Sequence, residues 1–217
     1  MLSFTHCIWD FNGTILDDVE TGIRSVNTML AARGLRTISG KEEYRTLFHF
    51  PVIDYYRQLG FDFEREPYEK LAPEWVALYL HHVQTARMFS DVVATLRWLR
   101  SRGVRQIILS ATERNMLMGQ VESLGIGEYF DEVLGLCDIH AGSKLSLAVE
   151  WRERNPNARA VFLGDTDHDV DTARVMDADC YLIAAGHQNA EHLRSTGAPV
   201  FSSLTDWKNT VLTPSDT

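Results

Sequence analysis

Short apolar runs recur along the chain, and each run ends in a small or acidic residue. The runs lie at residues 7–9, 104–109, 133–134, 161–163 and 181–183. Continuous apolar runs of this length suit strands that are buried on both faces, as in a parallel sheet. We therefore predict a β-strand at each of these five places.

Helical patterns alternate with these runs. Residues 91–100 place their apolar side chains on one helical face, and residues 116–124 do the same before Gly125, a favourable helix C-cap. Strands that alternate with helices are typical of an α/β fold with a doubly wound, Rossmann-like parallel sheet. In such a fold, ligands bind at the carboxyl ends of the strands.

The stretch from residue 18 to residue 89 breaks this alternation. It carries helical patterns at residues 19–33, 41–48, 52–59 and 67–81, and it contains no convincing strand. An all-helical insertion directly after the first strand and its loop is typical of a mobile cap. We therefore predict an α/β core domain at residues 1–17 and 90–217, with a helical cap domain at residues 18–89.

Composition and charge narrow the classes of partner. Of the 217 residues, 45% are hydrophobic and 24% charged, and the formal net charge is −9. An acidic chain of this kind repels phosphate backbones and anionic membranes, so we expect neither nucleic acid nor a membrane as partner. Three cysteines without metal-ligand spacing, no apolar run of about 20 residues and no signal-peptide pattern favour a cytoplasmic protein.

The first segment that carries chemistry is Trp9-Asp10-Phe11-Asn12-Gly13-Thr14. An apolar strand ends in an aspartate, and a Gly-Thr turn follows at once. A carboxylate at this place can act as a nucleophile if a metal ion offsets its repulsion of an anionic substrate. The N–H groups of the turn can hold phosphate oxygens. The alternative is an ordinary strand end followed by an Asx-turn.

Three further places follow the same logic. Ser110 ends the run at residues 104–109, Lys144 stands in Ala-Gly-Ser-Lys before a helix, and Asp165 and Asp169 follow the run at residues 161–163. A hydroxyl and a lysine can bind phosphate oxygens, and two carboxylates suit a hard cation. Each feature also has an ordinary structural interpretation, as a turn, a surface charge or acids at a helix N-terminus.

The order of these four segments resembles the four motifs of the haloacid dehalogenase-like hydrolases, over nearly the whole chain. The subgroup with a helical cap between the first two motifs, similar to phosphoglycolate phosphatase and β-phosphoglucomutase, is the best match. The resemblance implies a phosphatase that forms an aspartyl-phosphate on Asp10. The residues implied are Asp10, Asn12 and Lys144 for catalysis, Thr14, Ser110, Ala111 and Lys144 for the substrate, and Asp10, Asn12, Asp165 and Asp169 for Mg²⁺.

The sequence departs from this pattern at Asn12, where most such phosphatases carry an aspartate. That aspartate protonates the leaving alcohol and later activates water, and an amide can do neither. We expect a small phosphorylated metabolite as substrate, with a good leaving group such as an acyl phosphate or anhydride. Arg45 of the cap is our candidate for a contact with an anionic group of the substrate. The oligomeric state stays open.

Two alternatives remain. In the first, the chain is a relative with weakened catalytic activity that binds a phosphorylated ligand. In the second, it is an enzyme that cleaves phosphonates. Phosphonate cleavage needs a Schiff-base lysine in the cap, and Lys41 and Lys70 are the only candidates there.

Overall fold

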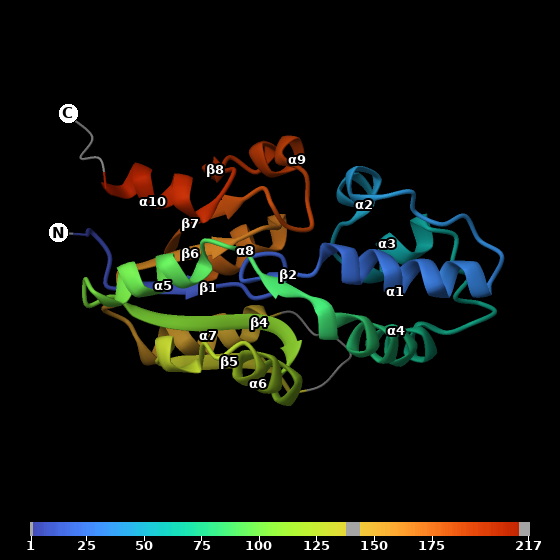
Figure 1. Ribbon diagram of the computed structural model, residues 1–217, viewed down its shortest axis with the longest axis horizontal. Coiled ribbons are helices and arrows are strands. Elements are labelled where there is room, and N and C mark those ends of the chain that lie inside the picture. The colour runs from blue at the N-terminus through green and yellow to red at the C-terminus, as the bar shows by residue number, and fades with distance from the viewer. Residues whose placement is uncertain (1, 138–143, 213–217) are drawn as a thin grey trace.

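Within residues 2–137 and 144–212, which the computed structural model describes, six parallel strands form the central sheet (Figure 1). Their spatial order is β5-β4-β1-β6-β7-β8. The strands are β1 (His6–Trp9), β4 (Arg105–Glu113), β5 (Glu132–Leu136), β6 (Ala160–Gly164), β7 (Ala178–Ile183) and β8 (Val200–Phe201). The strand order reverses between β1 and β6, so a ligand is expected where these two strands end.

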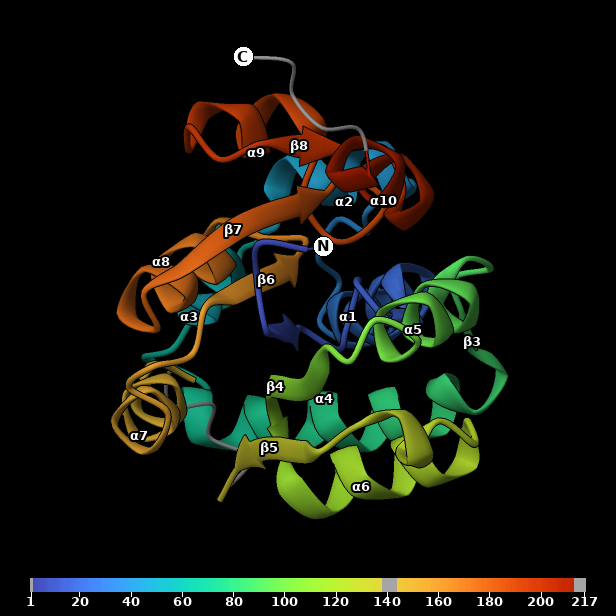
Figure 2. The ribbon, with the colours of Figure 1, turned by 90° about the vertical axis from the view of Figure 1, so that its left-hand side faces the viewer.

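Helices cover both faces of the sheet, and Figure 2 shows α5 and α6 on the side opposite α7 and α8. Cys7 and Trp9 of β1 pack in one hydrophobic cluster, while Ile8 between them packs in another. This alternation buries β1 on both faces, as the apolar runs predicted. The helices of the core are α5 (Val92–Arg100), α6 (Arg114–Ser123), α7 (Leu145–Arg154), α8 (Asp167–Val175), α9 (Ala190–Ser195) and α10 (Leu204–Leu212), with a 3₁₀ turn at Gly127–Tyr129.

The predicted doubly wound α/β fold is confirmed, with differences at the strand ends. Strand β4 runs on to Glu113, past the predicted end at Ser110, and its register with β5 shifts between Leu109 and Glu113. Strand β8 was missed because two residues are too few to show a periodic pattern.

The segment after β1 is mainly helical, as predicted, but residues 87–88 of the predicted all-helical range form a short strand, which was missed because two residues are too few to show a periodic pattern. It contains α1 (Val19–Ala32), α2 (Lys41–Leu47), α3 (Val52–Gln58), α4 (Tyr68–His82) and a 3₁₀ turn at Val83–Thr85. These helices share a hydrophobic cluster of their own, which includes Ile23, Tyr56 and Leu71. None of the helices in the described ranges is long and apolar enough to cross a membrane.

A small antiparallel ribbon joins this helical insertion to the core. Strand β2 (Leu16–Asp17) pairs with β3 (Arg87–Met88), with Leu16 opposite Met88 and Asp17 opposite Arg87. The chain therefore leaves the core and returns to it at neighbouring positions, and the insertion lies beyond one end of the sheet (Figure 1).

Candidate active site

Three buried carboxylates meet where β1 and β6 end. Asp10 directly follows β1, and its N–H donates to the carbonyl of Leu163 at 2.8 Å, which continues the pairing of the two strands. Asp165 follows β6, and Asp169 lies in the first turn of α8. One carboxylate oxygen from each acid lies within 4.8 Å of the others. Three acids this close form a potential site for a hard cation.

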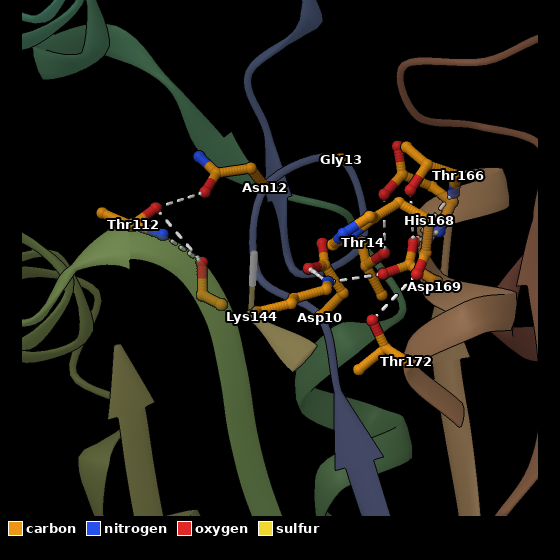
Figure 3. Close-up of polar contacts among 12 residues, drawn as sticks. Asp10, Asn12, Gly13, Thr14, Thr112, Lys144, Thr166, His168, Asp169 and Thr172 are labelled. Atoms are coloured by element: carbon orange, nitrogen blue, oxygen red, sulfur yellow. Dashed lines mark hydrogen bonds and ion pairs between the residues drawn. The ribbon is translucent and has the colours of Figure 1, made fainter. Parts of the chain in front are cut away.

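Lys144 lies between two of these acids (Figure 3). Its ammonium donates to Oδ1 of Asp10 and to Oδ1 of Asp169, both at 2.5 Å. The other carboxylate oxygen of Asp169 accepts from the N–H groups of Asp165 and Thr166 and from the Thr166 hydroxyl, all at 2.9 Å. Asp169 therefore holds Lys144 in place against the turn between β6 and α8.

If all three acids were ionised, Lys144 alone would leave the cluster with a net negative charge. Burial raises the pKa of Asp10 well above its usual value, although Lys144 opposes the shift, and burial raises the pKa of Asp165 to about 7. Burial also acts against ionisation of Asp169, but Lys144 outweighs it and lowers the pKa of that carboxyl. A divalent cation would favour the ionised forms of Asp10 and Asp165, so the donor set fits such an ion.

Two glycines let neighbouring loops close around Asp165. A Cβ atom at Gly13 would lie 2.2 Å from Oδ2 of Asp165, and one at Gly186 would lie 2.1 Å from the same oxygen. The Thr14 hydroxyl donates to Oδ1 at 3.1 Å, and the N–H of His187 donates to Oδ2 at 2.6 Å. The loops after β1 and β7 thus fix the orientation of this carboxylate.

The amide of Asn12 is fully used by neighbouring groups. Its Nδ2 donates to Oδ2 of Asp18 at 2.8 Å and to the Tyr79 hydroxyl at 2.7 Å. Its Oδ1 accepts from the hydroxyl of Thr112 at 2.7 Å (Figure 3). Asp18 in turn accepts from the Tyr79 hydroxyl at 2.7 Å and from the N–H of Gly13 at 2.9 Å. Asn12 therefore links the loop after β1 to the insertion and to β4.

His187 extends this network to α2. Its Nε2 lies 3.2 Å from Oδ1 of Asp18, and its Nδ1 lies 2.9 Å from the Tyr44 hydroxyl. Burial alone would lower the pKa of His187, but the Asp18 carboxylate raises it to about 9. Burial likewise opposes ionisation of Asp18, but His187 lowers the pKa of that carboxyl below its ordinary value. Asp18 and His187 therefore form a buried ion pair at neutral pH.

A cavity of about 220 Å³ connects these groups to the insertion. Asp10, Asn12, Ser110, Ala111, Lys144 and Asp165 border it on the core side. Side chains of α1 to α4 and of the loops between them border it on the other side. The position fits a ligand held between the strand ends and the helical insertion.

Comparison with known proteins identifies the family. The sequence matches the haloacid dehalogenase-like hydrolase family over residues 7–183. The chain belongs to the haloacid dehalogenase-like hydrolases. It is 25% identical to a phosphoglycolate phosphatase of Nitrosococcus oceani, across 92% of this chain and 93% of the relative. It is 22% identical to a phosphoglycolate phosphatase of Pseudomonas savastanoi, across 84% of this chain and 70% of the relative.

Solved structures show the same fold. Protein Tyrosine Kinase A of Mycobacterium tuberculosis superposes with a TM-score of 0.79 and 22% identity, covering 96% of this chain and 98% of that one. A haloacid dehalogenase-like family hydrolase of Streptococcus pneumoniae superposes with a TM-score of 0.73 and 18% identity, covering 97% of this chain and 98% of that one. The family match and these relatives show that the chain is a phosphoric monoester hydrolase similar to phosphoglycolate phosphatases.

The structure of this haloacid dehalogenase-like hydrolase brings most of the predicted site residues to one cavity, but three lie apart from it. The hydroxyl of Thr14 donates to Asp165, and Asp169 lies behind Lys144. Arg45 is not among the residues that border the cavity. Its guanidinium donates to the carbonyls of Ala185 at 2.6 Å and Gly186 at 2.8 Å, because α2 packs against the loop after β7. Residues 141–143 of the predicted lysine motif lie outside the described residues.

The sequence analysis missed four residues of this network. Asp18, Tyr79 and Thr112 contact the Asn12 side chain, and His187 contacts Asp18. An aspartate directly before a helix is typical of an N-cap. Here Asp18 makes no side-chain capping bond to α1.

The lysines considered for phosphonate cleavage do not reach the cavity. Lys41 and Lys70 are both exposed, and neither is among the residues that border it. Within the described residues, the insertion therefore offers no lysine for a Schiff base at this site.

The ion pair of Asp18 and His187 predicts a pH-dependent stability. The folded-state pKa of His187 is about 9, above its ordinary value of 6.5, so the contribution is complete below pH 6.5 and is lost as the pH rises through 9. We expect the unfolding free energies of the native protein and the His187→Gln variant to converge by at most about 3 kcal/mol over this range. Denaturant unfolding at several pH values measures this, with His81→Gln as the control, since His81 is exposed and has no ion pair among the described residues. A constant difference from pH 6 to pH 9.5 would contradict the ion pair.

Proposed function

We propose that the protein is a magnesium-dependent phosphatase that moves the phosphoryl group of a small phosphorylated metabolite to Asp10 and then to water. The observation that supports it best is the buried Asp10 carboxylate, 2.5 Å from the Lys144 ammonium and close to Asp165 and Asp169 at the core end of a cavity. Residues 18–89 act as the cap domain above this site. The free thiols of Cys7, Cys137 and Cys180 support a cytoplasmic location.

The proposed chemistry has two displacement steps. A carboxylate oxygen of Asp10 attacks phosphorus, and the bond from phosphorus to the leaving oxygen breaks, which gives an aspartyl-phosphate. Water then attacks phosphorus, releases inorganic phosphate and restores the carboxylate. Lys144 offsets negative charge on the phosphoryl oxygens in both steps, while the Ser110 hydroxyl and the backbone at Ala111 orient the phosphoryl group.

The metal site in this proposal consists of the carboxylates of Asp10 and Asp165 and the backbone carbonyl of Asn12. A bound Mg²⁺ supplies Lewis-acid polarisation of the phosphoryl group and reduces its repulsion by the acids. Asp169 already holds Lys144 and three further donors, so we assign it to positioning Lys144, and it would support a bound ion directly or through water. Thr14 orients Asp165, and Arg45 fastens α2 to the core.

The experiment for this proposal is a screen of phosphorylated metabolites that measures released phosphate with Mg²⁺ and with excess chelator. We expect release from at least one metabolite with Mg²⁺, loss of most of that activity in chelator, and recovery when Mg²⁺ is restored. Asp165→Asn should behave like the chelated enzyme. Asp171→Asn, which removes an exposed charge from α8, is the matched control.

Two results would contradict the proposal. Undiminished release in excess chelator would exclude the metal site. Tight binding of phosphate analogues without release from any metabolite would instead favour the weakened, ligand-binding relative.

A further inference from the structure

The insertion lines its side of the cavity with aromatic and aliphatic side chains. Eight aromatic residues of the insertion border the cavity, among them Tyr44, Phe48, Tyr55, Tyr56 and Trp75. No lysine or arginine of the insertion borders it within the described residues. We call this side of the cavity the aromatic wall. Its chemistry favours an apolar ligand body with π-faces.

The charged groups near the aromatic wall disfavour a second anionic group on the substrate. Asp18, the one charged residue that the described insertion contributes to the cavity, is paired with His187. Glu113 borders the cavity too, and its hydrogen bonds from the N–H groups of Asn115 and Met116 lower its pKa and keep it ionised. A carboxylate on the substrate body would therefore lie against apolar surface and a like charge, which is costly.

The size of the cavity matches a single ring beside a phosphoryl group. A cavity of about 150 Å³ with an apolar lining is enough to hold benzene, and this one measures about 220 Å³.

From these observations we propose that the substrates are aryl phosphates, the phosphate monoesters of phenols. The ring packs on the aromatic wall while phosphorus faces Asp10. This inference rests on the proposed phosphatase function and adds the class of its substrate.

The missing acid at Asn12 fits an aromatic leaving group. When the Asp10 carboxylate attacks phosphorus, the electron pair of the breaking bond stays on the phenolate oxygen. A phenol has a pKa of about 10, whereas an alkyl alcohol, like water, has a pKa of about 16. The phenolate therefore departs without a proton from the protein and takes one from bulk water. Water then attacks phosphorus, and the net reaction is aryl phosphate plus water to phenol plus inorganic phosphate. The absence of an acid at position 12 therefore slows the first step little.

The experiment compares kcat/KM for phenyl phosphate, benzyl phosphate and 2-phosphoglycolate with Mg²⁺. We expect phenyl phosphate to exceed 2-phosphoglycolate at least roughly 30-fold, because the insertion offers the carboxylate of the latter no lysine or arginine and His187 is already paired with Asp18. Benzyl phosphate keeps the ring but has an alkyl leaving group, so it should bind as well as phenyl phosphate and turn over more slowly. Calorimetry with benzylphosphonate and phosphonoacetate, in the presence of Mg²⁺, measures the same preference without turnover.

A variant that adds a cation tests the aromatic wall directly. Val76 borders the cavity on α4, and Val76→Arg should shift the ratio of the two kcat/KM values toward 2-phosphoglycolate at least roughly tenfold. Val149→Arg, on the exposed side of α7, should leave the ratio unchanged.

The outcomes separate the two proposals. Phosphate release that favours 2-phosphoglycolate over phenyl phosphate overturns the aromatic substrate class and leaves the phosphatase function intact. No release from any ester, together with a preference for benzylphosphonate over phosphonoacetate, supports the aromatic wall as a binding site and contradicts the phosphatase function. Equal binding of the two phosphonates, or none, overturns the inference.

Discussion

Asp10→Asn should reduce phosphate release at least roughly 10⁴-fold on every substrate that the native enzyme hydrolyses. The amide has the shape of the carboxylate but is not a nucleophile, so the aspartyl-phosphate cannot form. The change should spare the fold, because Lys144 keeps its 2.5 Å contact with Asp169. Initial rates of phosphate release, measured with Mg²⁺ on protein of confirmed mass, give the size of the loss.

The covalent step can be observed independently of the rate. Acid quenching of the native enzyme during turnover should leave one added phosphoryl group on the peptide that contains Asp10, and the same peptide of the asparagine variant should carry none. Residual activity above about a hundredth of the native rate, or a phosphoryl group on another peptide, would contradict Asp10 as the nucleophile.

The second large effect concerns Asn12 and Asp18 together. Asn12→Asp alone would place a carboxylate where Nδ2 now lies 2.8 Å from the Asp18 carboxylate. Two unit charges at that distance repel by about 6 kcal/mol at an effective dielectric constant of 20. One of them would therefore bind a proton, and the single variant should gain little activity. The double variant Asn12→Asp, Asp18→Asn exchanges amide and carboxylate, and we expect it to turn over an alkyl phosphate up to about 10²-fold faster than the native enzyme.

A double-mutant cycle tests this coupling. It requires kcat for an alkyl phosphate and the thermal midpoint for the native protein, the two single variants and the double variant. If the two positions are coupled, kcat and the thermal midpoint of the double variant should both be higher than the sum of the two single-variant effects predicts. If Asn12→Asp alone reaches the full gain at unchanged stability, the two positions are independent. If no variant gains activity, Asn12 does not limit the rate.

The sequence contained enough information to predict the fold and the core end of the site. Parallel strands such as β1 and β6 are buried on both faces, so they are continuous apolar runs that can be recognised one by one. The residues that follow adjacent parallel strands meet at one edge of the sheet. Asp10 and Asp165 could therefore be placed together although they are far apart in the chain.

The contacts between the insertion and the core could not be predicted in this way. Asp18 and Tyr79 meet because α1 and α4 pack side by side, and helix packing leaves no local signature in either segment. Arg45 was predicted to bind substrate because an arginine in a cap suits anions, yet carbonyl groups of the loop after β7 occupy its donors. The charges were visible in the sequence, but their partners depended on packing.

The ribbon of β2 and β3 has a consequence for how such proteins diversify. Asp17 and Arg87 are opposite each other, so a two-residue hairpin turn between them would close the stem and remove the insertion without re-threading the sheet. By the same route, another insertion could be grafted onto the stem. The graft would exchange the aromatic wall but leave Asp10, Lys144 and Asp165 in the core. It would also remove Tyr79, which contacts Asn12, and Tyr44, which contacts His187, so successful exchange should require compensating changes at Asn12 and His187.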